Sequence, residues 1–354
     1  MLHYDLHMNV LDPFTYSFPP SLIAQQPMRP RDHSRLLIVD RKTGAITHTS
    51  FYHIDTFLKK GDIIVMNNSQ VFPARLIGIK KDTGGKCEIL LIRPVENKKT
   101  FTWSMRWYII GKPRLRDGHI IIFSKKMYGT ISTDHTRKKI ITFNISDKEL
   151  EHEIQRKGKV PVPHYIKTSM HGKKLQKAYQ TVYAKHIGSV AAPTAGFHFT
   201  KRLIARLKRK GVLFHYVTLH VGLGTFQMPP RLFKNFSFIP EQGEISATTA
   251  KALNTAKKEG RRIVAVGTTT TRTLESFTTQ GILHPGKKYI DLYIYPGYTF
   301  RFVDALITNF HLPQSTPLLL VSTFSNTDLI LKAYQEAIQK KYRLFSFGDA
   351  MLII

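Results

Sequence analysis

The sequence predicts an α/β fold in which a larger domain with a mainly parallel sheet carries an inserted small β-barrel. Strands alternate with helices from about residue 182 onward, short β-like runs fill the stretch 71–143, and strand signals also occur near the N-terminus. Strand–helix alternation is typical of a parallel sheet, and many short strands are typical of a barrel or sandwich. The predicted larger domain therefore comprises 1–66 and 151–354, and the predicted insert comprises 67–150.

Composition supports a folded, soluble protein with a polyanionic partner. The chain has 354 residues, 42% of them hydrophobic, which excludes a disordered chain. Its 53 Lys and Arg residues against 24 Asp and Glu give a formal net charge of +29, and such an excess favours binding to phosphates. The single cysteine, Cys87, excludes an internal disulfide framework and a cysteine-cluster zinc site. We find no secretory leader and no long apolar run, and therefore expect a cytoplasmic protein without a membrane span.

The first half of the chain reads as strands and turns. Leu36–Val39 is a predicted strand that runs into a turn at Asp40–Gly44. The insert is predicted from β-like runs separated by the turn signals Gly84-Gly85, Lys112-Pro113 and Asp117-Gly118. These runs are Cys87–Arg93, Trp103–Ile110, His119–Phe123 and Lys139–Phe143.

The second half changes to a helical and strand-like alternation. Ser146 and Glu149 have the spacing of a capping box, and Thr200 precedes an apolar helical stripe that ends at Gly211. Further predicted helices are 246–259, a helix after Gly267, and 328–341, and further predicted strands are 212–220, 262–266, 289–295 and 303–307.

Four segments with small and polar residues lie at predicted strand ends. They are 192–200, 218–226, 267–276 and 308–313. Ligands of α/β sheets collect where strands end, glycines let a ligand approach the backbone, and helix-start amides with threonine hydroxyls suit anions or sugar hydroxyls. Each segment alone also fits a plain connection, but four in one domain favour a shared pocket.

Two phosphate- or nucleotide-binding motifs are suggested by the sequence but fail on context, and a zinc signature is absent. Gly222-x-Gly224 lacks a third glycine, and Pro229-Pro230 follows where a helix should begin. Gly84-Gly85-Lys86 is followed by Cys87 and lacks the spacing of a phosphate-binding loop. No His-Glu-x-x-His signature occurs, so ATP hydrolysis and zinc catalysis are disfavoured and no metal site is predicted. Basic clusters, each of which also fits a solvated surface, occur at 106–116, 137–139, 202–210 and 340–341.

The four segments, taken with several further stretches, resemble the S-adenosylmethionine:tRNA ribosyltransferase-isomerase family of queuosine biosynthesis over essentially the whole chain. The further matching stretches include 22–27, 73–76, 83–86, 179–184 and 348–353. The resemblance implies an α/β domain with an inserted barrel. It also implies transfer of the ribosyl part of S-adenosylmethionine to 7-aminomethyl-7-deazaguanine at the tRNA wobble position. The expected products are epoxyqueuosine in tRNA, adenine and methionine. S-adenosylmethionine would thus be a consumed cosubstrate, with no other cofactor, and we expect a monomer.

Such a reaction requires a base near the ribose 5′ carbon, because the adjacent sulfonium acidifies the protons on that carbon. The candidate proton carriers are His198, His220 and His311, with Glu241 and Glu275 as carboxylates. Arg272 is a candidate partner for the methionine carboxylate or a phosphate. The other candidate substrate-binding residues are Arg75, Thr194, Gly196, Gly222, Gly224, Thr225, Thr268, Thr269 and Asn309.

The chain departs from the family pattern near Glu241. The family usually shows His-x-x-His-x-Glu there, whereas Phe236 and Ile239 take the histidine positions in this chain. A catalytically impaired tRNA-binding homologue is therefore the alternative function. A conventional methyltransferase is a third possibility, which predicts S-adenosylhomocysteine as a product and which Pro229-Pro230 disfavours.

Overall fold

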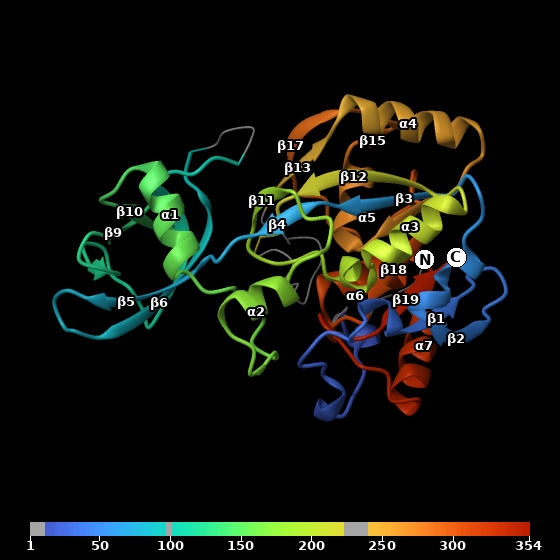
Figure 1. The fold of residues 1–354 in the computed structure, drawn as a ribbon, viewed down its shortest axis with the longest axis horizontal. Helices are drawn as coiled ribbons and strands as arrows, with labels where there is room; N and C mark the ends of the chain where they lie inside the picture. The colour runs from blue at the N-terminus through green and yellow to red at the C-terminus, as the bar shows by residue number, and fades with distance from the viewer. Residues whose placement is uncertain (1–10, 97–100, 223–239) are drawn as a thin grey trace, which may run out of the picture.

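A nine-stranded mixed sheet forms the centre of the larger domain, with the order β17-β13-β12-β3-β14-β18-β19-β1-β2. The structure, a computed structural model, describes residues 11–96, 101–222 and 240–354. Figure 1 shows this sheet with its helices beside a separate barrel, so the predicted α/β class with an additional barrel is confirmed. The strands are β1 (Arg35–Val39), β2 (Ile46–Ser50), β3 (Ile63–Asn67), β12 (Leu213–Leu219), β13 (Glu241–Ile245), β14 (Ile263–Val266), β17 (Gly286–Ile290), β18 (Ala305–Asn309) and β19 (Ala350–Ile353).

Parallel pairing is confined to part of the sheet. The four central strands β12, β3, β14 and β18 are parallel, and so are β19 and β1. The pairs β17–β13, β13–β12, β18–β19 and β1–β2 are antiparallel, so the prediction of a mainly parallel sheet holds for the centre and fails towards both edges. A parallel pair needs a long crossover, whereas the turn between Val39 and Ile46 is short enough for an antiparallel hairpin only.

Successive residues of the central strands point to two apolar layers. Ile63 and Val65 of β3 face the layer that holds α4, α5, α6 and α7, whereas Ile64 and Met66 face the layer of α3. Both faces of the sheet are therefore buried, as expected for a central strand. The helices are α3 (Lys201–Arg209), α4 (Ala247–Lys258), α5 (Thr268–Ser276), α6 (Thr316–Phe324) and α7 (Thr327–Gln339). No helix within the described ranges is long and apolar enough to cross a membrane.

The barrel is closed and antiparallel, with the order β10-β7-β6-β5-β8-β9. Trp107, Leu91 and Ile131 fill its core, and α1 (Asp147–Lys157) packs against it through Leu150 and Ile154. The predicted capping box at the start of α1 is confirmed. The barrel strands all fall within 67–150 and are β5 (Arg75–Lys80), β6 (Lys86–Pro94), β7 (Arg106–Lys112), β8 (Ile120–Ile122), β9 (Tyr128–Thr133) and β10 (Lys139–Phe143).

Most predicted elements of the second half occur with small shifts at their ends. Thr200 caps α3 by accepting a hydrogen bond from the Leu203 amide, as the sequence predicts. The predicted strand 289–295 is wrong from residue 291 onward, because β17 spans Gly286–Ile290. Its partner β13 starts at Glu241, directly after Pro240, which has no amide hydrogen to continue the pairing.

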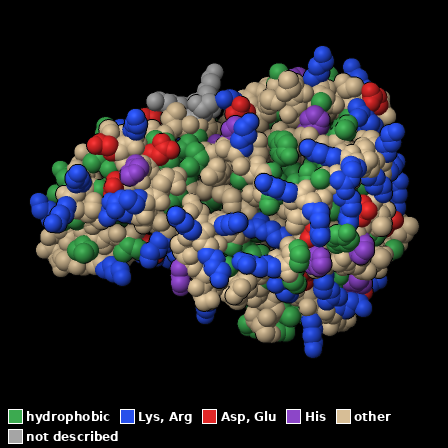
Figure 2. All heavy atoms as spheres, in the orientation of Figure 1, with side chains coloured by type: hydrophobic (Ala, Val, Ile, Leu, Met, Phe, Trp, Pro, Cys, Tyr) green, Lys and Arg blue, Asp and Glu red, His purple; other side chains and the backbone are tan. Residues whose placement is uncertain are grey.

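A linking region between barrel and sheet holds α2 (Gly172–Ala178) and the short parallel pair β4 (Ser69–Val71) and β11 (His186–Ser189). Its own apolar cluster includes Ala178, Tyr179 and Phe197. The remaining described strands, β15 (Thr278–Thr279) and β16 (Ile282–Leu283), each have two residues and form a short hairpin. Figure 2 shows Lys and Arg side chains spread over the barrel, the linking region and the larger domain on one face.

Candidate active site

A hollow opens at the carboxyl ends of β14 and β18. This is the edge of an α/β sheet where ligands generally bind. Three of the four predicted segments line it, through 192–195, 267–269 and 308–312. The sequence-predicted residues Thr194, Thr268, Thr269, Asn309 and His311 are thereby brought to one site.

The fourth segment reaches this hollow only through Val221 among its described residues. Gly222 and His220 line a second hollow instead, between the barrel residues Arg93 and Phe101 and the sheet residue Glu241. The predicted site residues Gly224 and Thr225, like Phe236 and Ile239, lie outside the described residues.

Two helices begin at the first hollow and point their positive ends towards it. Gly267, with φ of +88°, is the N-terminal cap of α5 and lines the hollow together with Thr268. Ser315 caps α6 and also lines it. Helix N-termini favour negative charge, so this rim suits a carboxylate or a phosphate.

Asn309 presents an uncommitted acceptor in this hollow. Its Nδ2 donates to the Phe345 carbonyl at 3.1 Å and lies 3.3 Å from His198 Nε2. The Phe345 carbonyl can only accept, which fixes the amide orientation and leaves Oδ1 on the other side. Among the described residues Asn309 Oδ1 has no hydrogen-bond partner, although the side chain is 2% exposed. Such an acceptor suits an amino or hydroxyl donor.

His198 lies behind Asn309 and does not line the hollow. Because Asn309 Nδ2 is a donor, His198 Nε2 accepts and the neutral ring carries its proton on Nδ1, which lies 2.7 Å from Ser34 Oγ. His198 thus contacts the Asn309 amide from outside the hollow, and its role as a proton carrier stays a prediction. His311 does line the hollow, with Nε2 2.7 Å from Thr308 Oγ1.

Burial keeps all three candidate histidines neutral near pH 7. Removal from water lowers the pKa of His198 and of His311 to about 3, and nearby Arg343 and Arg31 lower that of His198 further. Burial, with His186 nearby, lowers the pKa of His220 to about 4. Neutral imidazoles cannot donate a proton as general acids here, and they are weak bases.

We expect acid to destabilise the fold through these rings. Between about pH 6.5 and pH 3 these histidines are protonated in the unfolded chain but stay neutral in the folded chain. The free energy of unfolding therefore falls as the pH is lowered through this window. Urea unfolding at pH 7, 6 and 5 measures the slope. The variant His198→Gln should have a slope shallower by up to about 1.4 kcal/mol per pH unit, since one proton fewer is taken up. Equal slopes would contradict the burial of a neutral His198.

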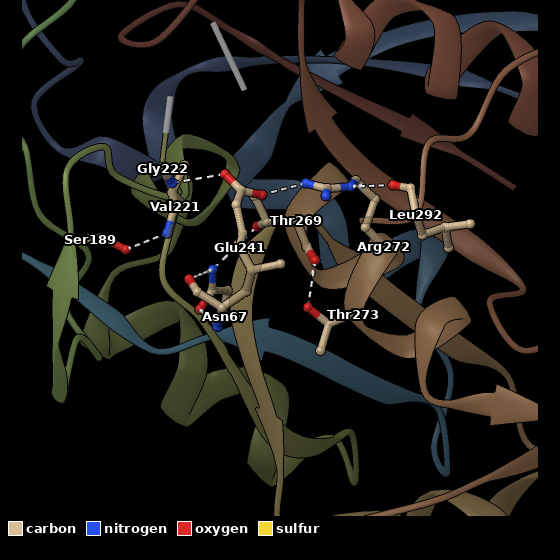
Figure 3. Close-up of polar contacts among 10 residues, drawn as sticks. Asn67, Ser189, Val221, Gly222, Glu241, Thr269, Arg272, Thr273 and Leu292 are labelled. Atoms are coloured by element: carbon tan, nitrogen blue, oxygen red, sulfur yellow. Dashed lines mark hydrogen bonds and ion pairs between the residues drawn. The ribbon is translucent and has the colours of Figure 1, made fainter. Parts of the chain in front are cut away.

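Arg272 and Glu241 form a buried ion pair, which Figure 3 shows. Arg272 of α5 donates from Nη1 to Glu241 Oε2 at 2.5 Å and from Nε to the Leu292 carbonyl at 3.0 Å. Glu241 Oε1 accepts from the Gly222 amide at 2.8 Å. The Arg272 side chain is 9% exposed and that of Glu241 is 1% exposed. Arg272 is predicted to bind the methionine carboxylate or a phosphate of the ligand. In the structure its partner is instead the carboxylate of Glu241.

Arg272 nevertheless adjoins the hollow. A smaller hollow lined by Arg272, Tyr293 and Leu320 shares Thr268, Thr269 and Pro317 with the first one. Asn67, at the end of β3, donates to Thr269 Oγ1 at 3.3 Å and holds that side chain from below.

Three predicted site residues contact other parts of the chain and do not line the hollow. The Glu275 carboxylate accepts from the amides of 301–303 and from Tyr298 Oη, so it ties that loop to α5 and does not line the hollow. Arg75 lies in the barrel strand β5 and donates to the Val162 carbonyl. Gly196 is buried, and a Cβ at its position would lie 1.9 Å from Tyr183 Oη.

His220 is set in a polar contact network at the second hollow. Its Nδ1 lies 2.8 Å from Ser69 Oγ, which is 2.6 Å from Ser189 Oγ. A Cβ on Gly188 would lie 2.6 Å from His220 Nδ1, so only glycine leaves room for the ring.

Sequence reasoning missed several lining residues as site members. Tyr165 and Tyr179 reach the hollow from the linking region, and Phe345 and Ser346 reach it from the loop before β19. Tyr165 Oη lies 2.7 Å from Ser346 Oγ, and burial raises the pKa of both tyrosines so that the phenols keep their protons. Tyr179 stands in a stretch that resembles the family, which was a usable signal, whereas nothing around Tyr165 marked it.

Within the described ranges no group of three His, Cys, Asp or Glu side chains lies close enough together to hold a metal ion.

The fold and the site together define a class of protein. The mixed sheet has two helix N-termini, hydroxyl side chains and aromatic rings at one edge, which is typical of α/β enzymes whose small-molecule site lies at the strand ends.

Comparison with known proteins identifies the family within this class. The model of the family described as queuosine biosynthesis protein matches residues 11–353. The S-adenosylmethionine:tRNA ribosyltransferase-isomerase of Caldanaerobacter subterraneus subsp. tengcongensis is 44% identical over 347 residues, which are 96% of this chain and 98% of that one. The protein of the same name from Natranaerobius thermophilus is 43% identical over 349 residues, 97% and 99% of the two chains. The chain therefore belongs to the queuosine biosynthesis family, as its sequence predicts.

A solved structure agrees with this assignment. The crystal structure of S-adenosylmethionine tRNA ribosyltransferase from Thermotoga maritima is 36% identical, with a TM-score of 0.56. The match covers 97% of this chain and all of that one, so the likeness includes both the sheet and the barrel.

Proposed function

We propose that this chain transfers and isomerises the ribosyl part of S-adenosylmethionine onto 7-aminomethyl-7-deazaguanine at the wobble position of tRNA. Epoxyqueuosine in tRNA, adenine and methionine are the products, and S-adenosylmethionine is consumed as the cosubstrate, with no other cofactor. The observation that carries the proposal is the single hollow formed by three of the four predicted segments at the ends of β14 and β18.

The chemistry of the lining fits a sulfonium nucleoside. The N-termini of α5 and α6 suit the methionine carboxylate, and the hydroxyls of Thr194, Thr268 and Thr269 suit ribose. Asn309 Oδ1 accepts from an amino or hydroxyl group of the ligand. Tyr165 and Phe345, whose ring centroids are 5.2 Å apart, offer apolar faces to a purine.

His311 is the proton acceptor that we assign to the 5′ carbon. It is the histidine among the described lining residues of the hollow. A base whose pKa is about 3 is weak, so the sulfonium must supply most of the acidification. The monomeric state stays a prediction, and a tRNA substrate supports action in the cytoplasm.

Adenine release tests this proposal. Incubation with S-adenosylmethionine labelled in the adenine ring and tRNA carrying the aminomethyl base should release one adenine per epoxyqueuosine formed. The matched control is the same tRNA with guanine at the wobble position, which should release none. Tight tRNA binding without adenine release would instead favour the catalytically impaired homologue suggested by Phe236 and Ile239. Formation of S-adenosylhomocysteine would favour a methyltransferase.

A further inference from the structure

The positive charge of the chain is concentrated in one acid-free stretch. Between Glu153 and Glu241 the sequence contains sixteen Lys and Arg residues and no Asp or Glu. The whole chain has 24 acidic residues in 354, so a stretch of this length would contain about six if they were evenly spread. A general excess of basic residues does not explain the complete absence of acidic ones here.

This acid-free stretch borders the candidate active site. Tyr165 and Tyr179, which flank α2, line the hollow, and so do residues 191–195 just before α3. The lysines of α2 therefore lie a few residues along the chain from Tyr179, which lines the hollow. Figure 1 places α2 between the barrel and the larger domain, and Figure 2 shows Lys and Arg side chains across that region.

The basic residues of α2 and α3 differ in part in their partners. At α3, Arg206 pairs with Asp55 at 3.3 Å and the capping residue Lys210 donates to the Asp55 carbonyl at 2.5 Å, so both fasten the helix to the chain. Arg202 lies 3.6 Å from Asp32, whereas the exposed Lys201 and Arg209 make no ion pair or hydrogen bond with any described residue. On α2, Lys173, Lys174 and Lys177 are exposed, and their side chains make no ion pair or hydrogen bond with any described residue. Three cations without acidic partners suit an external polyanion.

The segment that carries these lysines is firmly held. Arg31 donates to the carbonyls of Lys177, Ala178 and Gln180, at 3.0, 2.8 and 2.6 Å. The Gln25 side chain donates to the Tyr165 carbonyl at 3.1 Å and accepts from the Lys167 amide. A surface that is fixed before binding loses little conformational entropy when a ligand docks.

We propose that α2, through Lys173, Lys174 and Lys177, grips the phosphates of the tRNA anticodon arm while the wobble base enters the hollow. The proposal rests on the proposed function for the identity of the RNA. Lysine contacts to phosphates position an RNA without reading its sequence. These three side chains should therefore contribute to binding of any tRNA and not to the choice of the base.

The test compares two triple variants that each remove three exposed lysines. K173Q/K174Q/K177Q alters α2, and the matched control K42Q/K251Q/K258Q alters the β1–β2 turn and α4. Anisotropy with a labelled anticodon stem–loop should show at least tenfold weaker binding for the α2 variant only. Its slope of log affinity against log salt should fall by about two to three, and the control should match wild type. Thermal unfolding of both variants should match wild type, because all six side chains are exposed.

Further measurements separate this proposal from the proposed function. In steady state, the α2 variant should show a raised KM for tRNA with kcat and the KM for S-adenosylmethionine unchanged. Stem–loops with and without the aminomethyl base should lose affinity by the same factor. Unchanged binding and salt slope in the α2 variant, or an equal loss in the control, would overturn the docking surface. Binding is measured without turnover, so this result stands even if wild type releases no adenine, an outcome that would refute the proposed function alone.

Discussion

Replacing Glu241 by Gln is expected to lower the free energy of unfolding by about 3 kcal/mol or more, because it leaves the buried Arg272 guanidinium without its opposite charge. The same change weakens the hold on the Gly222 amide and on α5, whose first residues line the hollow. A displacement of reacting groups by about 1 Å can cost a factor of about 100 in rate. Urea unfolding and the adenine-release rate measure the two losses.

A double-mutant cycle shows whether the loss belongs to the ion pair. Arg272→Met alone should also destabilise the fold, because it leaves the Glu241 carboxylate buried opposite an apolar side chain. The variant E241Q/R272M should be less destabilised than the sum of the two single changes, with a coupling of about 1–3 kcal/mol. Additive losses would mean that the two side chains act independently.

Replacing Gly196 by Ala is expected to have the second large effect. The new methyl group would lie 1.9 Å from Tyr183 Oη and 2.8 Å from Thr181 Cγ2, so the backbone of 194–198 must move. Overpacking of this kind costs about 1–3 kcal/mol. Thr194 and Ala195 line the hollow, so adenine release should fall by a factor of about 100 as well.

The variant Tyr183→Phe supplies the control for this prediction. Tyr183 Oη is buried and makes no hydrogen bond within the described part of the chain, so its removal alone should leave stability nearly unchanged. In G196A/Y183F the closest contact is gone, and part of the stability and activity should return. Thr181 Cγ2 at 2.8 Å and the ring Cζ of residue 183 at 2.9 Å still limit the recovery. No recovery in the double variant would show that the clash with the Tyr183 hydroxyl is not the cause.

Much of the fold is predictable here because local patterns and tertiary packing agree. The capping box at Ser146 and the cap at Thr200 act within one turn of helix, so the sequence alone predicts them. The antiparallel pairs β18–β19 and β12–β13 escape prediction, because strand direction depends on which distant strand lies alongside. The end of β17 at Ile290 likewise depends on its partner, which begins after Pro240.

The site divides in the same way. By itself, the sequence determined the family, the α/β class with its barrel, and the glycine- and threonine-bearing segments, because these follow from residue order and local chemistry. Only the tertiary structure decided that His198 lies behind Asn309, that Arg272 is paired with Glu241, and that Glu275 fastens a loop. Burial, pKa and hydrogen-bond partners are set by groups that are far apart in the chain, and packing alone brings those groups together.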